Sequence, residues 1–259
     1  MNLLQSAILG VIEGLTEFLP ISSTGHLIIA QKMLGLPQVD DFMTVVIQSG
    51  AILSALVYFR HKIWDIIINK RSALPKLFVS MTPVLIIGFL VKKQLESYND
   101  TIPVIAVSSI VGGIFFYMVE RFYSARASRD LVTGTFLDYL GLGVVQVLSL
   151  IPGFSRSGAA IAGGLINNIK LKDSIEISFL MGIPLLLIAT GYKLVSHTYT
   201  VDSTLLINTF VATVIAFIVG LAGIKLTLGW VQKYGFRPFM YYRIGLGVLL
   251  LIAYFSKLI

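Results

Sequence analysis

A pair of short polar motifs occurs twice in this otherwise apolar sequence. The segments Gly10–Glu13 and Ser22–Gly25 return, both at the same offset of 133 in the numbering, as Gly143–Gln146 and Ser155–Gly158. The apolar runs that follow the first copy fall on apolar runs of the second copy when they are shifted by the same offset. The sequence therefore predicts an internal duplication, with repeat one in 1–125 and repeat two in 134–259 of a single membrane domain.

Composition places the chain in a membrane. Its 259 residues are 56% hydrophobic and only 13% charged, with a mean hydropathy of +0.87, which leaves too few charges to cover a water-soluble surface. A hydrocarbon core of about 30 Å needs about 20 apolar residues in each helix. Six runs meet this length: 39–59, 74–91, 101–121, 174–195, 205–225 and 240–258.

The two motif regions contain shorter apolar stretches that cannot cross a membrane. Pro20 and the Ser22–Gly25 motif interrupt the first region, and Pro152 and the Ser155–Gly158 motif interrupt the second. Each region is predicted to be a re-entrant helix-loop-helix hairpin whose loop lines a cavity. Three crossings per repeat are an odd number, so the second repeat is inverted relative to the first. The predicted fold class is all-α integral membrane, with six transmembrane helices, two re-entrant hairpins and an inverted-topology repeat.

The basic residues indicate the orientation. The positive-inside rule makes the side with more Lys and Arg cytoplasmic, which places both termini and the mouth of the first hairpin outside. This distribution explains the net charge of +7, so membrane lipid is an expected partner and nucleic acid is not. Tyr242 is expected to be an interfacial anchor. The cytoplasmic set is Arg60, Lys62, Lys70, Arg71, Lys76, Arg121, Arg126, Arg129, Lys170, Lys172, Lys225, Lys233, Arg237 and Arg243.

Two carboxylates lie in the first hairpin. Glu13 and Glu17 are four residues apart, so a helix places both on one face of an otherwise apolar segment. Such a pair is stable if a divalent cation bridges it, if Arg156 or a wet cavity compensates it, or if one carboxyl keeps its proton and serves as an acid or base. A solvated helix face is the alternative. Mg²⁺ or Ca²⁺ fits only if a bound phosphate completes its ligands.

The first motif predicts an anion site beside these carboxylates. A serine of the motif is placed to cap a helix whose free backbone N–H groups point back into the loop. Ser22, Thr24 and Gly25 are the predicted phosphate-binding residues of this loop, beside Ser23. His26 lies in the same first turn, and its ordinary pKa suits a base, a proton carrier or a nucleophile.

The second motif adds a guanidinium. Ser155, Arg156, Ser157 and Gly158 again form a predicted helix start. An arginine at membrane depth needs an anionic partner, and its planar fork matches a phosphate. Gln146 occupies the position of Glu13, so one half brings the acid, base and nucleophile groups and the other brings the phosphate clamp.

Together, Glu13–Pro20, Ser22–Leu27 and Pro152–Gly158 resemble the undecaprenyl-pyrophosphate phosphatases, the bacitracin-resistance proteins, over essentially the full length. The resemblance implies hydrolysis of undecaprenyl diphosphate to the monophosphate and phosphate at a bacterial inner membrane, with a site open to the periplasmic face. It implies an acidic pair in Glu13 and Glu17, a catalytic group in Ser23 and His26, and an arginine motif in Ser155 and Arg156. Either Ser23 or His26 is the nucleophile.

One position departs from the family pattern. Ala160 stands where family members often have threonine, and Ser157 is a candidate to replace that hydroxyl. A lipid-phosphate transporter or flippase is the alternative function, because inverted repeats with broken helices are typical of secondary transporters. Small-residue faces at Gly112-Gly113 and Gly220–Gly223 allow packing within one chain or in a homodimer.

Overall fold

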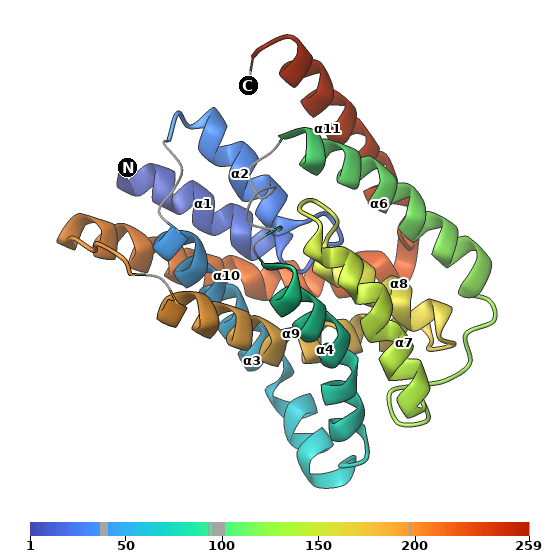
Figure 1. Cartoon of the computed structure of the whole chain (residues 1–259). Helices are drawn as coiled ribbons and strands as arrows, with labels where there is room; N and C mark the ends of the chain where they lie inside the picture. Colours follow the sequence, from blue (N-terminus) through green and yellow to red (C-terminus); the bar gives the residue numbers. More distant parts are fainter. Residues whose placement is uncertain (37–40, 93, 95–101, 197, 259) are drawn as a thin grey trace.

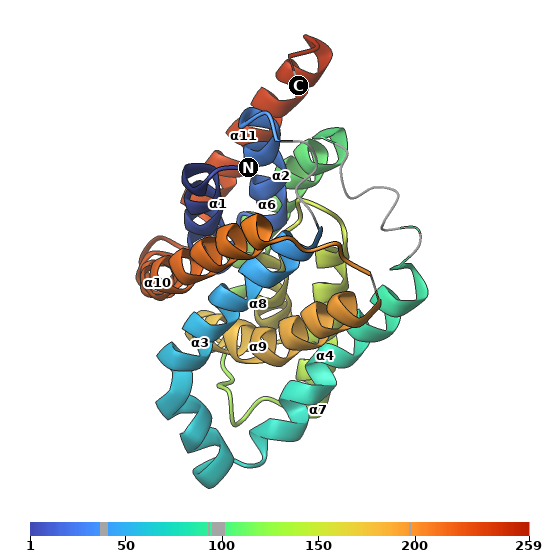
Figure 2. The same ribbon diagram turned by 90° about the vertical axis from the view of Figure 1, so that its left-hand side faces the viewer.

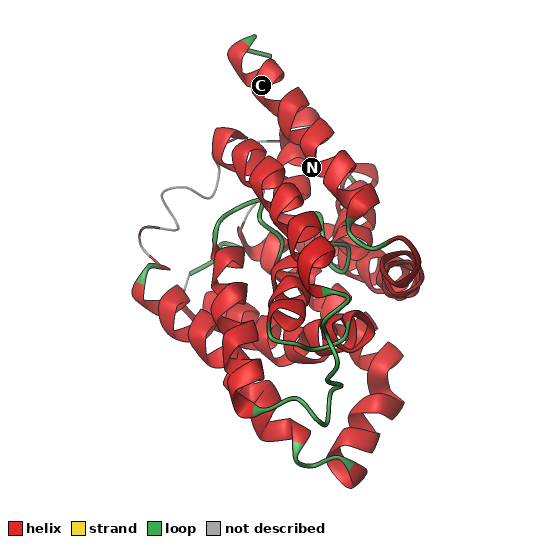
Figure 3. Ribbon diagram, turned by 90° about the vertical axis from the view of Figure 1, so that its right-hand side faces the viewer, coloured by secondary structure: helices red, strands yellow, loops and turns green. Residues whose placement is uncertain are grey.

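The protein is a bundle of helices. The computed structural model describes residues 1–36, 41–92, 94, 102–196 and 198–258, and these residues form helices but no β-strand (Figure 3). The α-helices, labelled in Figure 1, are α1 Leu3–Thr16, α2 Ser23–Met33, α3 Asp41–Asn69, α4 Ala73–Leu90, α6 Ile102–Tyr123, α7 Phe136–Gln146, α8 Arg156–Ile166, α9 Leu171–Ser196, α10 Ser203–Tyr234 and α11 Arg237–Phe255, with a 3₁₀ turn η1 at Val147–Leu150.

Six of these helices are long and apolar enough to span a membrane: α3, α4, α6, α9, α10 and α11. Each overlaps one of the six predicted runs, so six crossings are confirmed and the chain is a multi-pass membrane protein. Helices α3 and α10 continue past the predicted ends at 59 and 225, to 69 and 234, and residues 39–40 and 101 of the predicted runs lie outside the described residues. Many of their large apolar side chains, such as Phe89, Phe210 and Leu249, are exposed on the outside of the bundle. Such a surface is stable against lipid and not against water.

The two motif regions form two short helix pairs. Helix α1 has 14 residues, and α2, α7 and α8 have 11 residues each. The three 11-residue helices are only about 16 Å long, which is too short to cross a membrane. Helix α1 packs on α2, and α7 packs on α8. Helix α1 also packs on α10, and α7 packs on α4, so each short pair is buried against long helices of the bundle.

The sequence specifies where both short pairs begin. The Asn2 side chain accepts a hydrogen bond from the N–H of Gln5, and the Gln5 side chain accepts one from the N–H of Asn2. Thr135 and Asp138 form the same reciprocal pair at the start of α7. These capping boxes satisfy N–H groups that a helix start leaves open.

Helix α8 lies at the centre of the bundle. Every residue from Ser157 to Leu165 is buried, and most are Ala or Gly. Helices α7, α9 and α6 pack on α8 (Figures 1 and 2). The small side chains of α8 allow this close approach. The loop before α8, which carries the second motif, is therefore held inside the protein.

The two small-residue faces pack within the chain. A Cβ on Gly112 would collide with the Arg243 side chain, and a Cβ on Gly220 would collide with Ser54. Gly223 lies against the backbone of Gly14. Close helix contacts inside one subunit therefore account for both faces.

Candidate active site

Ser22 ends the loop between α1 and α2 and caps α2. Its φ is 73°, in the left-handed region that favours glycine, and its Oγ accepts a hydrogen bond from the N–H of Gly25 at 3.4 Å. No hydrogen bond within the described residues uses the N–H groups of Ser23 and Thr24. The start of α2 thus offers two backbone donors and the positive end of a helix dipole.

Ser155 repeats this geometry at the start of α8. Its φ is 83°, and its Oγ accepts a hydrogen bond from the N–H of Gly158 at 3.2 Å. The two loops lie against each other, since a Cβ on Gly25 would be 3.7 Å from the Cα of Gly153. Both helix starts therefore border the same small region.

Glu17, Ser23 and Arg156 meet between the two loops. The Ser23 Oγ donates to the Glu17 Oε2 at 2.5 Å, and the Arg156 Nη2 donates to the Glu17 Oε1 at 2.8 Å. Glu17 is 6% exposed and Ser23 is 7% exposed. A hydroxyl paired with a buried carboxylate has a proton acceptor in place, and the neighbouring guanidinium offers positive charge to an anion.

Arg156 is held by the backbone, and one of its three nitrogens is without a partner in the part of the chain that the structure describes. Its Nη1 donates to the Ser178 carbonyl at 2.8 Å, and its guanidinium fills the space that a Cβ on Gly182 would occupy. Its Nε is buried with no hydrogen-bond partner among the described residues. Ser157 links the two loops, because its Oγ donates to the Leu19 carbonyl at 3.0 Å.

Two further buried polar groups have atoms without partners. Glu13 is 1% exposed and its Oε1 makes no hydrogen bond within the described residues. Gln146, at the position matching Glu13 in the second motif, is wholly buried, and neither of its amide atoms is paired there. Buried polar atoms without partners are costly, so both side chains are candidate positions for a bound water or ligand.

His26 is bonded at both ring nitrogens. Its Nδ1 lies 2.7 Å from the Ser22 carbonyl, and its Nε2 lies 2.7 Å from the Tyr242 hydroxyl. A carbonyl only accepts, so Nδ1 carries the proton, and in the neutral ring Nε2 accepts from Tyr242. The two rings are stacked, with centroids 5.7 Å apart.

Comparison with known proteins places the chain in a family. The family model described as bacitracin resistance protein BacA matches residues 6–249. The chain belongs to the BacA family. The resemblance found in the motifs is thereby confirmed.

Relatives are similar to the chain from end to end. The undecaprenyl-diphosphatase of Bdellovibrio bacteriovorus is 40% identical, covering 99% of this chain and 97% of the relative. The undecaprenyl-diphosphatases of a Sulfurovum species and of Methanococcus aeolicus are 39% and 38% identical, covering 97% and 98% of this chain and 99% of each relative.

In this BacA family member the structure brings together most of the residues that the motifs indicate. Glu17, Ser22, Ser23, Ser155, Arg156 and Ser157 meet at the contact between the loops. Thr24 is exposed and lies at the edge of this cluster. Ala160 is wholly buried in α8, and the nearby Ser157 hydroxyl is used to hold the first loop.

One residue of α11 was misassigned from sequence. Arg243 was expected on the cytoplasmic surface, but it is fully buried and binds the backbone of both loops. The neighbouring Tyr242 is 46% exposed, so its predicted role as an interfacial anchor stays a prediction, and its hydroxyl also contacts His26. An arginine at the start of an apolar run resembles a boundary residue, and only its neighbours in space show its role. The internal repeat does not indicate this role either, because the residue of the first repeat that matches Arg243 is Ile110.

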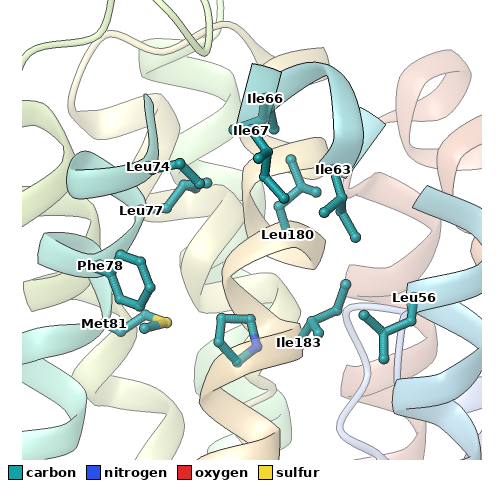
Figure 4. Close-up of a pocket in the computed structure, with 11 residues that line it drawn as sticks. Leu56, Ile63, Ile66, Ile67, Leu74, Leu77, Phe78, Met81, Leu180 and Ile183 are labelled. Atoms are coloured by element: carbon teal, nitrogen blue, oxygen red, sulfur yellow. The ribbon is translucent and has the colours of Figure 1, made fainter. Parts of the chain in front are cut away.

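Two apolar hollows lie outside the polar cluster. One is a pocket of about 170 Å³ that is lined by apolar side chains of α3, α4 and α9. Figure 4 shows its lining, including Leu56, Phe78 and Ile183. A groove of about 430 Å³ lies beside the second loop, where Ile151 and Phe154 face Val104, Val107 and Val111 of α6. The groove is next to the residues that carry the second motif.

Proposed function

We propose that this chain is an undecaprenyl-diphosphatase, which hydrolyses undecaprenyl diphosphate to undecaprenyl phosphate and inorganic phosphate. Full-length similarity to relatives of that name supports the substrate. The observation that carries the reaction is the contact of Glu17, Ser23 and Arg156 between two helix starts. In bacteria this activity returns the lipid carrier to cell-wall synthesis and confers bacitracin resistance.

Ser23 is the nucleophile in the proposed mechanism. Its Oγ forms a bond to the terminal phosphorus, the bond from phosphorus to the bridging oxygen breaks, and the lipid monophosphate leaves. Glu17 takes the Ser23 proton, because the Ser23 Oγ already donates a hydrogen bond to the Glu17 Oε2 at 2.5 Å. Water then hydrolyses the phosphoserine and restores Ser23. His26 is less suited to attack, because both of its nitrogens have partners.

The phosphate is held from both loops in this mechanism. Arg156 has a buried, unpaired Nε and a guanidinium fixed by Ser178, so it is oriented before the substrate arrives. The helix starts capped by Ser22 and Ser155 add backbone N–H groups. Preorganised donors stabilise the charge that spreads over the transferred phosphoryl oxygens.

A divalent cation, Mg²⁺ or Ca²⁺, fits one of the two predicted carboxylate ligands. The Glu13 Oε1 has no partner among the described residues, whereas Ser23 and Arg156 take the two oxygens of Glu17. No group of three His, Cys, Asp or Glu side chains in the described parts of the chain is arranged to hold a metal. Phosphate oxygens would complete the ligands beside Glu13, and the cation would neutralise phosphate charge there.

The two short helix pairs are re-entrant hairpins of an inverted repeat in this proposal. Support comes from capping boxes at Asn2 and Thr135 and from left-handed caps at Ser22 and Ser155, each pair at matching positions of the two repeats. The turn after α3, the start of α4 and the start of α9 share one end of the bundle, where Lys62 pairs with Glu176. We take this basic end as cytoplasmic, and the mouth of the first hairpin then opens to the periplasm.

The groove beside the second loop suits the prenyl chain. It is apolar, it adjoins Phe154 directly before Ser155, and Val107 and Val111 on its wall are about half exposed, at 50% and 53%. A lipid can therefore enter it sideways from the bilayer while its diphosphate reaches the polar cluster.

Phosphate release from undecaprenyl diphosphate by the detergent-purified chain, with and without EDTA, tests the proposal. Turnover that EDTA abolishes and Mg²⁺ or Ca²⁺ restores supports both the reaction and the cation. Turnover that EDTA leaves unchanged removes the cation from the proposal. Folded protein that shows no turnover in added Mg²⁺ or Ca²⁺ would contradict hydrolysis and would favour lipid-phosphate transport. The names of the relatives do not favour transport.

The proposed orientation predicts which side of the membrane the first hairpin faces. The chain has no cysteine, so single cysteines can be labelled without background. Thr24→Cys, at the exposed start of α2, is expected to react with an impermeant maleimide added to intact cells. Ser72→Cys, in the turn before α4, is the matched control and is expected to react only after permeabilisation. Protection of Thr24→Cys together with labelling of Ser72→Cys in intact cells would reverse the orientation.

A further inference from the structure

Arg243 of α11 is a buried charge that the proposed reaction does not use. Its side chain is 0% exposed and makes no ion pair within the described residues. A buried arginine without an anion is expensive in a membrane unless its N–H groups are satisfied in another way.

Backbone carbonyls satisfy this side chain. The Nε donates to the Ser109 carbonyl at 3.0 Å, and the Nη2 donates to the Ser108 carbonyl at 3.1 Å, so two bonds fix the guanidinium on α6. The guanidinium also lies 5.1 Å from the centre of the Phe116 ring. The guanidinium fills the space left by the missing side chain of Gly112, because a Cβ on Gly112 would collide with Nη2.

The remaining bonds go to the two loops. The Nη1 donates to the Pro20 carbonyl at 3.1 Å, and the Nη2 donates to the Gly153 carbonyl at 3.0 Å. Pro20 and Gly153 occupy matching positions of the two repeats, and each comes two residues before a left-handed cap, at Ser22 and Ser155. One planar group therefore binds the same position of both loops.

We propose that Arg243 is a positioning residue that sets the distance between the two loops and thereby between Ser23 and Arg156. This inference rests on the proposed function for its effect on turnover. A guanidinium is suited to the role because its donors diverge in one rigid plane, so two carbonyls that bind it are fixed relative to each other. The caps at Ser22 and Ser155 transmit that spacing to the starts of α2 and α8.

The test compares Arg243→Met and Arg243→Lys with wild type. Lysine keeps the charge but, with a single ammonium, cannot hold both loops and α6, so both variants are expected to lose at least tenfold in kcat with a smaller change in KM. Arg237→Lys is the matched control on the exposed start of α11 and is expected to stay within twofold. Wild-type kcat in Arg243→Met would overturn the proposal.

A distance measurement separates positioning from a direct chemical role. Spin labels on Met33→Cys in α2 and Ile151→Cys in the second loop, both exposed, report the spacing by pulsed electron resonance. A narrow distance distribution is expected in the protein with Arg243, and a broader or shifted distribution is expected with Arg243→Lys. The lysine variant keeps the test available if Arg243→Met does not fold. An unchanged distribution overturns the proposal even if turnover falls. The distances need no turnover, so failure of the proposed function is distinguishable from failure of this inference.

Discussion

Replacement of Arg156 by alanine is expected to lower the kcat of undecaprenyl diphosphate hydrolysis by at least a hundredfold. That factor corresponds to about 2.7 kcal/mol of transition-state stabilisation. The side chain supplies the only guanidinium that contacts Glu17 in the described residues, and its free Nε and fixed orientation suit a phosphate. Phosphate release under saturating substrate measures the effect.

Two controls define this result. Arg156→Lys keeps the charge but cannot bind Glu17 and the Ser178 carbonyl together, so we expect it to recover less than a tenth of wild-type kcat. Arg126→Ala, at an exposed position between α6 and α7, is expected to behave as wild type. Near-wild-type turnover by Arg156→Ala would refute a phosphate clamp at this residue.

Replacement of Glu17 by glutamine is expected to cost a similar factor in kcat. The amide has nearly the shape of the carboxylate, but it cannot take the Ser23 proton and it leaves Arg156 without its ion pair. Single-turnover phosphate release measures the chemical step directly, which separates a slow reaction from weak binding.

The control for Glu17 is another glutamate in an ion pair. Glu176→Gln loses the partner of Lys62 at the basic end of the bundle, away from the loops, and is expected to keep turnover within twofold. Equal losses in Glu17→Gln and Glu176→Gln would point to general destabilisation and would count against a base at Glu17.

The crossings and the caps followed from local sequence. Each long apolar run became one long helix, because a membrane requires all backbone groups to be paired within the segment. A serine of the first motif was expected as a helix cap because serine oxygen accepts from the first turn, and the structure shows that Ser22 is that cap. The second motif was expected to start a helix flanked by hydroxyls, and Ser155 caps it in the same way. The spacing of Glu13 and Glu17 likewise places them one helical turn apart.

The contacts between the halves were harder to predict. Pairing of Arg156 with a glutamate was one of several possibilities, and only the structure shows that Glu17 is the partner. The left-handed φ of both serines has no sequence signal, because serine rarely adopts it. The burial of Arg243 and the contact of Tyr242 with His26 were missed, since both depend on a loop near the opposite end of the chain.

These long separations have a consequence for biosynthesis. Arg243 binds a carbonyl 223 residues before it, and Tyr242 binds a histidine 216 residues before it. Translation runs from the N-terminal side, so the first hairpin is synthesised long before the residues of α11 that bind its loop. Glu17 can pair with Arg156 only after another 139 residues have been made, and the Pro20 carbonyl can pair with Arg243 only later, when α11 has been made. Helix α11 thus completes the contacts of a hairpin that enters the membrane well before it.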